Sequence, residues 1–202
     1  MKRIVCGLSI IMLGLAGTAM AADLDAAIES CSGCHGNDGI STSSDVPTIA
    51  GLSEFYHSDQ LYLYRDEERP CGDAEYSQGD MSGQTSNMCA LTADLTDDQI
   101  DAIAVHFAEL PFQPAKQEFD AALAAAGSAI HERDCRMCHS EGGSVAEDDA
   151  GILSGQWLGY MEMTFGQYRS GDREQPGPMQ KKIAALSDDD VKALLHFYAS
   201  GQ

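Results

Sequence analysis

The chain has 202 residues, of which 32 are acidic and 12 are Lys or Arg, and its formal net charge at pH 7 is −20. This charge excludes nucleic acid as a partner, because the phosphate backbone would be repelled. Residues 22–112 carry 18 acidic residues and two arginines, a balance of −16, whereas residues 113–202 carry 14 acidic and eight basic residues, a balance of −6. The charge indicates either a solvated acidic coat, as in adaptation to salt, or steering of a basic partner by the first half.

The first 21 residues have the pattern of a secretory signal peptide. The chain begins MKR, continues with an apolar run from Ile4, and reaches the small-residue sequence Ala19-Met20-Ala21. A basic start, an apolar core and an A-x-A site predict a signal peptide over residues 1–21 that is removed on export. No other stretch approaches the ~20 apolar residues that a membrane-spanning helix needs. We therefore expect a mature chain in a bacterial periplasm, without a membrane span.

Two C-x-x-C-H motifs indicate the cofactor. They comprise Cys31, Cys34 and His35, and Cys135, Cys138 and His139. This motif is the attachment signature of c-type haem, in which two thiols add to the vinyl groups and the imidazole binds the iron. Paired-cysteine zinc sites use four cysteines or a spaced histidine pair, and a redox dithiol needs no histidine directly after its second cysteine. Two copies on a chain with only seven cysteines predict two covalently bound haem c groups.

The two motifs belong to an internal repeat. At the same offset of 104 residues, a glycine, two tyrosines and two arginines of the first half recur in the second: Gly51 and Gly155, Tyr56 and Tyr160, Tyr64 and Tyr168, Arg65 and Arg169, Arg69 and Arg173. Further on, "LTDDQIDAIAVHFA" from Leu95 matches "LSDDDVKALLHFYA" from Leu186 at an offset of 91. The first half therefore carries 13 additional residues between Arg69 and Leu95.

The matched terminal blocks have the pattern of amphipathic helices. Thr96 and Ser187 are N-cap candidates, and each is followed by acidic residues in the first turn, where the helix dipole favours them. Apolar residues then recur at helical spacing in both copies. We also expect helices over residues 24–30 and 119–134, directly before the two motifs.

Strand signals are nearly absent from the sequence, and each half reads as a helix, a haem motif, a middle helix and a terminal helix. A unit of about 90 residues has a thin core, which a haem would complete. The sequence therefore predicts an all-α fold of two tandem class I cytochrome c-like domains, residues 22–112 and 113–202. They would be joined at the proline-bearing segment 110–117 and related by a pseudo-twofold axis, with the haems near their shared interface.

The repeat also nominates a sixth ligand for each iron. Met88 and Met179 each stand seven residues before the matched leucines of the terminal blocks. A haem iron closed by a thioether sulfur carries electrons instead of binding small ligands. Met81 lies near Met88 and competes with it. The remaining histidines and two further methionines are expected to be structural or surface residues: His57, His106, His131 and His196, and Met161 and Met163 as core residues.

Cys71 and Cys89 bracket the additional segment of the first half. In an oxidising compartment we expect a disulfide between them, which would hold the neighbouring Met88 in place. A metal site formed by these two sulfurs with His57 is the alternative.

The second half resembles the diheme cytochrome subunit of flavocytochrome c sulfide dehydrogenase, through "FQPAKQEFDAALAAAGSAIHERDCRMCHSEGG", "ILSGQWLGYM" and "PMQKK". The resemblance extends from Phe112 to the C-terminus, whereas the first half matches mainly in its haem motif, Met88 and terminal helix. It implies covalent haem attachment by the four motif cysteines, and axial ligation by His35, Met88, His139 and Met179. The segment between Cys71 and Cys89 departs from the family.

The resemblance implies that the chain accepts electrons from a separate FAD-containing subunit that oxidises sulfide, and passes them to a soluble acceptor such as a small cytochrome c. No glycine-rich dinucleotide fingerprint is present, so we expect no flavin site and no active site on this chain. A free-standing diheme carrier between a quinol-oxidising complex and a terminal oxidase is the alternative function. An enzyme, such as a diheme peroxidase or a thiosulfate-oxidising cytochrome, would need an open or Cys-ligated iron, which the two methionines argue against.

Overall fold

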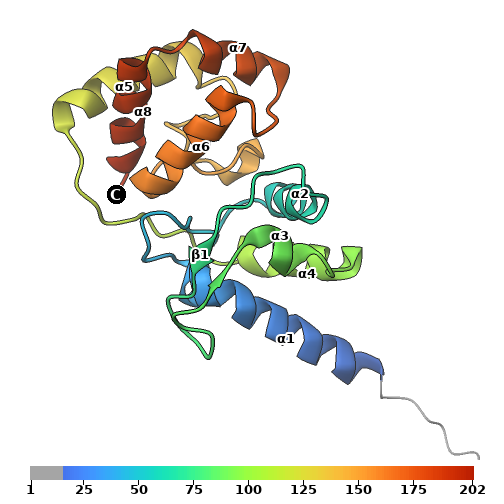
Figure 1. The fold of residues 1–202 in the computed structure, drawn as a ribbon. Coiled ribbons are helices and arrows are strands. Elements are labelled where there is room, and N and C mark those ends of the chain that lie inside the picture. Colours follow the sequence, from blue (N-terminus) through green and yellow to red (C-terminus); the bar gives the residue numbers. More distant parts are fainter. Residues whose placement is uncertain (1–15) are drawn as a thin grey trace, which may run out of the picture.

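The structure is a computed structural model that describes residues 16–202 (Figure 1). The expected signal peptide, residues 1–21, lies mostly outside the described residues. Helices dominate the described part of the chain, which confirms the all-α fold class. The α-helices are α1 (Ala16–His35), α2 (Glu54–Arg65), α3 (Met88–Thr92), α4 (Asp97–Ala108), α5 (Ala121–Asp134), α6 (Leu158–Ser170), α7 (Gly177–Ala185) and α8 (Asp188–Ala199). Short 3-10 turns lie at Asn37–Gly39 and Ala146–Asp148.

Within the described part of the chain, no helix combines the length and the apolar character that crossing a membrane requires.

The four helices of the first half recur in order in the second half, so that α1 corresponds to α5 and α4 to α8. In each half the terminal helix packs against the helix that carries the haem motif (Figure 1). A Cβ at Gly127 of α5 would collide with the backbone carbonyl of Ala193 on α8, so only glycine allows this close crossing. Phe107 on α4 and Tyr198 on α8 occupy matching core positions and are buried. The repeat therefore duplicates one packing unit.

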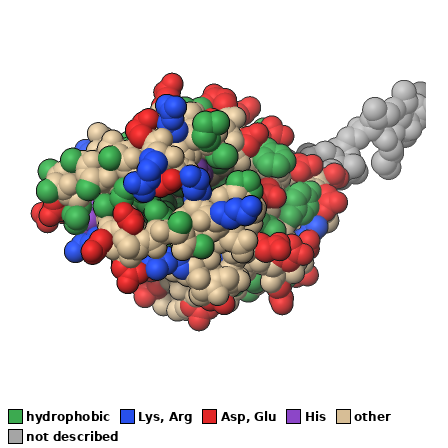
Figure 2. All heavy atoms as spheres, turned by 90° about the horizontal axis from the view of Figure 1, so that it is seen from above, with side chains coloured by type: hydrophobic (Ala, Val, Ile, Leu, Met, Phe, Trp, Pro, Cys, Tyr) green, Lys and Arg blue, Asp and Glu red, His purple; other side chains and the backbone are tan. Residues whose placement is uncertain are grey.

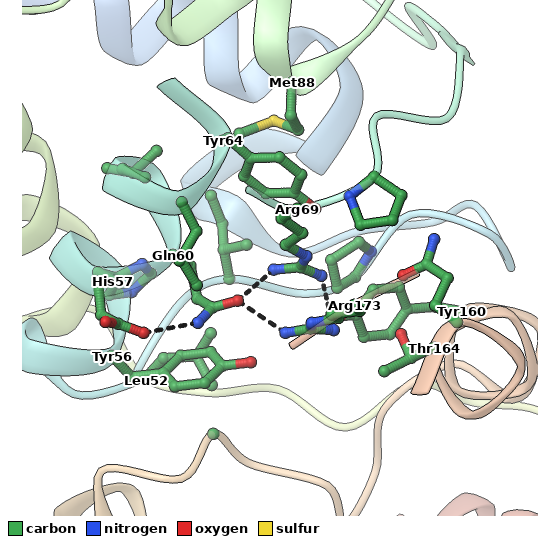
Figure 3. Close-up of a pocket in the computed structure, with 18 of the residues that line it drawn as sticks. Leu52, Tyr56, His57, Gln60, Tyr64, Arg69, Met88, Tyr160, Thr164 and Arg173 are labelled. Carbon is green, nitrogen blue, oxygen red and sulfur yellow. Dashed lines mark hydrogen bonds between the residues drawn. The ribbon is translucent and has the colours of Figure 1, made fainter. Parts of the chain in front are cut away.

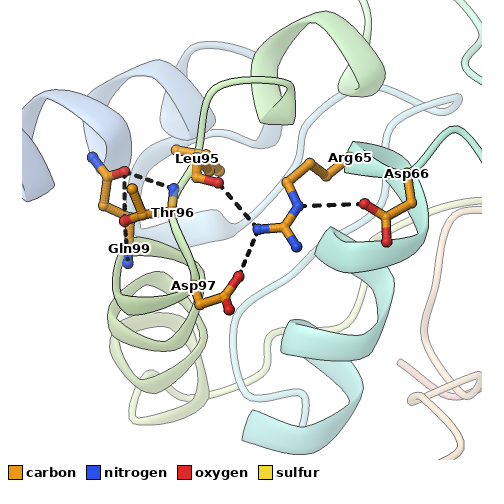
Figure 4. A network of polar contacts seen from close by, with 6 residues as sticks. All are labelled: Arg65, Asp66, Leu95, Thr96, Asp97 and Gln99. Carbon is orange, nitrogen blue, oxygen red and sulfur yellow. Dashed lines mark hydrogen bonds and ion pairs between the residues drawn. The ribbon is translucent and has the colours of Figure 1, made fainter.

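The predicted N-caps of the terminal helices are confirmed. Thr96 accepts a hydrogen bond from the Gln99 backbone, and Ser187 accepts one from the Asp190 backbone, each within a capping box. Arg65 of α2 donates to the Leu95 carbonyl and pairs with the Asp97 carboxylate at 2.8 Å, which ties α2 to the start of α4 (Figure 4). In the second half, Arg169 pairs with Asp188 at 2.6 Å in the same way.

The additional residues of the first half fold into a small hairpin. Its strands β1 (Ala74–Glu75) and β2 (Thr85–Ser86) are antiparallel, and among the described residues they form the only sheet. A disulfide between Cys71 and Cys89 closes the base of the segment, with the Cα atoms 5.8 Å apart, as expected from the sequence. Two-residue strands leave no alternating pattern in a sequence, so this hairpin was not predicted.

The two halves meet in a hydrogen-bonded interface. Gln156 of the second half donates to the Thr48 carbonyl at 2.6 Å and accepts from the Thr48 backbone N–H at 3.1 Å. Trp157 Nε1 donates to the Ser41 carbonyl at 3.0 Å. Gln117 of the linker donates to the Gln156 carbonyl at 2.7 Å, so the linker also binds the segment that contains Gln156. Segments far apart in the sequence therefore lock the halves together.

Candidate functional site

One large cavity contains every residue predicted to bind haem. Its volume is about 1490 Å³, which exceeds the ~300–1,000 Å³ of ordinary single-ligand pockets. Helices α1, α3 and α7 and the turn after α5 supply the predicted ligands that line it: Cys31, Cys34, His35, Met88, Cys135, Cys138, His139 and Met179. The structure thus brings the two haem motifs and both nominated methionines to the walls of one space between the halves.

The histidine of the first motif has a defined tautomer. His35 ends α1, is 8% exposed, and its Nδ1 lies 2.9 Å from the Pro47 carbonyl oxygen. A carbonyl only accepts hydrogen bonds, so Nδ1 carries the proton and Nε2 is the free ring nitrogen. Burial lowers the pKa of His35, with the Pro47 carbonyl opposing, which keeps the ring neutral. A neutral imidazole oriented through its second nitrogen is what metal ligation requires.

The histidine of the second motif is less constrained. His139 Nδ1 is buried and has no hydrogen-bond partner among the described residues. Burial lowers the pKa of His139, the neighbouring His131 lowers it further, and Asp148 opposes the shift. This ring is also neutral, but the protein fixes its orientation less firmly than that of His35.

The motif thiols do not resemble a redox dithiol or a thiolate metal site. Burial raises the pKa of the Cys31 thiol to about 11, and burial also raises the pKa of Cys34 and Cys135. Reactive dithiols instead have thiol pKa values below the ordinary range. The described residues also contain no group of three or more His, Cys, Asp or Glu side chains placed to hold a metal ion. The motif thiols therefore lack the lowered pKa that marks a reactive dithiol.

The methionines fall into distinct environments. Met88 begins α3 and Met179 lies in the first turns of α7, and both are half-buried on the cavity wall. Met81, the competitor of Met88, is 45% exposed in the hairpin and does not line the cavity. Met161 is a core residue as expected, but Met163 is 40% exposed, so its expected core role is wrong. Two residues along a helix lie about 200° apart, so α6 cannot bury both.

Two buried arginines, one from each half, lie next to each other on the cavity wall (Figure 3). Arg69 is 5% exposed and Arg173 is 4% exposed, and they occupy matching positions in the repeat. Neither pairs with a carboxylate among the described residues, and Arg69 Nε and Arg173 Nη1 are buried without any partner. A buried charge without a counter-charge is strongly unfavourable. The cavity therefore fits a group that carries carboxylates, and haem carries two propionates.

The arginines are joined by one side chain. Gln60 Oε1 accepts from Arg69 at 2.5 Å and from Arg173 at 2.7 Å, while Arg69 also donates to the Tyr160 hydroxyl at 3.1 Å (Figure 3). Tyr64 and Tyr168 lie under the two guanidinium groups at 4.4 and 4.6 Å. Burial alone would raise the pKa of Tyr160, but the positive charges of Arg69 and Arg173 lower it to about 8. The positive charges of Arg69 and Arg173 therefore favour an anionic group at this site.

These arginines were not predicted as functional residues. The signal was present, because two Arg and two Tyr recur at the offset of the haem motifs. Their meeting across the interface depends on how the halves pack, which the repeat alone does not specify.

The other histidines are structural, as expected, with one qualification. His131 is fully buried with Nδ1 3.1 Å from the Tyr198 hydroxyl, and His196 Nδ1 accepts from the Asp120 backbone. His57, however, borders the cavity, and burial lowers its pKa to about 4. The alternative metal site of His57 with Cys71 and Cys89 is not formed, because the two sulfurs form a disulfide.

Comparison with known proteins bears on the fold and the cofactor. Residues 22–110 match the family model described as cytochrome c. The chain is 29% identical to cytochrome c4 of Pseudomonas aeruginosa, over 92% of both chains. It is 26% identical to the thiosulfate dehydrogenase electron acceptor of Thiomonas intermedia, over 99% of this chain and 91% of that one. The crystal structure of reduced recombinant cytochrome c4 from Pseudomonas stutzeri matches with a TM-score of 0.70 at 24% identity, covering 89% of this chain and 97% of the other.

The fold is therefore two cytochrome c domains, the chain carries two covalently bound haem c groups, and its role is diheme electron transfer. None of the relatives named above is a sulfide dehydrogenase subunit, so the resemblance is confirmed for the diheme cytochrome and not for the sulfide-oxidising partner.

Proposed function

We propose that this chain is the electron-accepting subunit of a periplasmic dehydrogenase of reduced sulfur compounds, and that it passes electrons on to a soluble acceptor. The cavity between the halves, which is lined by two equivalent sets of two cysteines, one histidine and one methionine, supports the electron-transfer role. The observation that carries the choice of donor is the alignment of nearly the whole chain with a relative named as the electron acceptor of thiosulfate dehydrogenase. We divide the exported chain into domains at residues 22–112 and 113–202.

We assign each predicted residue a role. Cys31 and Cys34 would attach one haem and Cys135 and Cys138 the other, and His35 with Met88, and His139 with Met179, would hold the two irons. The bound haem supplies one reversible one-electron site in each half. Arg69 and Arg173 neutralise the propionates, and the apolar walls exclude water. A thioether in both sixth positions leaves no place for a small-molecule substrate.

Two observations support a sulfur-oxidising donor. The segments QPAKQ and GQW and the second haem motif resemble a sulfide dehydrogenase cytochrome subunit. A relative that aligns over 99% of this chain is named as an electron acceptor of thiosulfate dehydrogenase. Oxidation of sulfide or thiosulfate releases electrons in pairs. With two haems in one subunit, each electron of a pair can reduce its own iron.

A free-standing carrier is the second candidate function. It is favoured by the relatives named cytochrome c4, which align with this chain over nearly its whole length. Its cofactors, ligands and fold would be the same, so the two functions differ only in the electron donor.

The donor can be identified by reconstitution. The purified diheme chain is mixed with a sulfide-oxidising flavoprotein and sulfide, or with a thiosulfate dehydrogenase and thiosulfate, and haem reduction is followed by its absorbance. We expect one pair to reduce both haems within turnover time, and substrate without enzyme to reduce them far more slowly. Equal rates with and without enzyme for both pairs would reject the subunit function and leave the free carrier.

A further inference from the structure

The haem-motif loop of the first half is covered by the inserted hairpin. Gly33 lies so close to the Tyr76 ring that a side chain at this position would collide with it, and Tyr76 is only 5% exposed. The Ser77 backbone N–H donates to the Gly33 carbonyl at 2.8 Å, and Gln78 Nε2 donates to the Ser32 carbonyl at 2.9 Å. The Tyr76 ring and these hydrogen bonds of the hairpin therefore cover the haem motif at the end of α1.

The equivalent loop of the second half is open. Met137 takes the place of Gly33 at the offset of 104, and it is 87% exposed. Cys138 is exposed, whereas its counterpart Cys34 is 7% exposed. The second half lacks the 13 residues that form the cover. A haem attached through Cys138 would therefore be bonded to an exposed side chain, whereas one attached through Cys34 would be bonded to a buried one.

Basic side chains surround the open loop. Arg133, Arg136 and Lys182 are exposed, and Arg133, Met137 and Lys182 also line the cavity. Their counterparts in the first half are Glu29, Ser32 and Leu91. Acidic residues also lie within this group: Asp134 pairs with Arg133 and Lys182, Glu132 pairs with Arg136, and the charge of Asp190 acts on Arg133. Figure 2 shows Lys and Arg side chains gathered around a hollow on this face of an otherwise acidic molecule.

We propose that this surface, the open loop face formed by Arg133, Arg136, Met137, Cys138 and Lys182, docks a redox protein that presents carboxylates around an apolar contact point. The proposal rests on the proposed electron-transfer function and adds that the second haem is the one that exchanges electrons with this partner. Electron tunnelling weakens steeply with distance, so the haem that reaches the surface through an exposed cysteine has the shorter path.

The chemistry of the face matches such a partner. An exposed, flexible Met at the centre of a patch adapts to an apolar counterpart, and Arg and Met are enriched in protein interfaces. The three basic side chains steer and orient a carboxylate-bearing surface more than they add affinity. The covered, acidic loop region of the first half offers neither feature to this partner.

The test uses the full diheme chain with both haems reduced, and the anion ferricyanide as the first probe. Each ferricyanide takes one electron from one ferrous haem and becomes ferrocyanide. The kinetic phase of the second haem is identified as the one displaced in the Met179→Ala variant. In the wild-type chain we expect the second haem to be oxidised before the first.

Charge reversal at the face is compared with the same change elsewhere. Arg136→Glu with Lys182→Glu should slow oxidation of the second haem by about tenfold, because local charge governs the encounter rate of a charged reagent. The matched control, Lys116→Glu with Lys192→Glu, changes the net charge equally at exposed positions outside the cavity and should slow it far less. Because the two double variants have the same net charge, a difference between their oxidation rates is due to the position of the charges on the open loop face.

A second pair of variants guards against loss of folding through the Asp134 ion pair. Met137→Glu adds an acid at an 87% exposed side chain and should also slow the second haem, while Met81→Glu in the exposed hairpin should not. Cadmium-substituted plastocyanin, an acidic redox protein that cannot exchange electrons in this form, is the protein probe. It should broaden the NMR signals of the second haem and leave those of the first unchanged.

The proposal is overturned if the first haem reacts with ferricyanide as fast as the second, if both charge-reversed chains behave alike, or if plastocyanin broadens the signals of the first haem or of neither haem. These outcomes are separate from a failure of the proposed function. If the chain accepts electrons from its dehydrogenase but gives one of these contradicting results, the proposed function stands and the docking face is rejected. A chain that no dehydrogenase reduces could still show the ferricyanide asymmetry.

Discussion

The two halves of the molecule share one haem unit and differ in what surrounds it. Helices, caps and ligand positions are repeated, down to the ion pairs Arg65–Asp97 and Arg169–Asp188. Around that unit, the first half adds a disulfide-closed hairpin over its haem-motif loop, and the second half leaves its loop open. The repeated part is the one that lines the haem cavity, and the segments around the two haem motifs are where the halves differ.

The strongest test of the equivalence of the halves is the removal of each sixth ligand. Met179→Ala should abolish the sulfur-to-iron charge-transfer band of one haem and lower its reduction potential by on the order of 0.1 V, because thioether ligation favours reduced iron. Met88→Ala should do the same to the other haem. Spectroelectrochemistry measures both effects. Met81→Ala is the control, and an unchanged spectrum in Met179→Ala would refute the ligand assignment.

The disulfide should matter to one half alone. Replacing Cys71 and Cys89 by Ser removes the closure of an 18-residue separation and should lower the free energy of unfolding of the first half by about 3 kcal/mol. It should also loosen Met88, which precedes Cys89, so that the reduced first haem binds carbon monoxide. Denaturant titration and the carbon monoxide difference spectrum measure these effects. Carbon monoxide binding by the second haem instead would contradict this view.

The interface depends on a residue without a counterpart in the first half. Gln156 is 2% exposed and takes both backbone groups of Thr48, whereas its repeat equivalent is Leu52. Gln156→Leu should destabilise the chain by about 2 kcal/mol, because it leaves a buried N–H and C=O unpaired. In calorimetry we expect two unfolding steps for the variant and one for the wild type. The exposed Gln180→Leu is the matched control and should leave the transition intact.

Much of this architecture was accessible from the sequence, because its signals are local. The C-x-x-C-H motifs, the caps Thr96 and Ser187 and the spacing of Met88 and Met179 each involve a few neighbouring residues. The repeat supplied a second copy as a check. The structure places all eight predicted haem-binding residues on one cavity.

The features that were missed depend on contacts between distant residues. Gln60 binds both Arg69 and Arg173, the second of which lies 113 residues away in the sequence, and nothing near Gln60 indicates that role. The resemblance to one sulfide-oxidising family was too specific for a related reason. Its most distinctive residues, Gln117, Gln156 and Trp157, build the contact between the halves. They build the diheme architecture itself, so their support for a sulfur-oxidising donor is indirect, and reconstitution with the two dehydrogenases is the test that identifies the donor.

The smallest expected effect is on stability and comes from the ion pairs of Asp134, which have no equivalent in the first half. Asp134 bonds to Lys182 at 2.9 Å and to Arg133 at 2.7 Å, and its counterpart in the repeat is Ser30. Hydrogen bonds from Lys182 and Arg133 lower the pKa of the Asp134 carboxyl below its ordinary value. The unfolded chain then takes up the proton more readily, so the pair stabilises the fold above about pH 4, and this contribution is lost as the pH falls through the lowered pKa.

Asp134→Asn should therefore cost about 1 kcal/mol at pH 7, which is typical of a favourable surface pair, and the cost should vanish in acid. Denaturant titrations of wild type and variant at a series of pH values measure the difference. Asp80→Asn, an exposed aspartate in the hairpin, is the control and should show no such dependence. Because Lys182 also belongs to the open loop face, the variant frees a positive charge there, and it should speed the oxidation of the second haem by ferricyanide slightly. A destabilisation that persists unchanged in acid would show that Asp134 acts through packing and not through its charge.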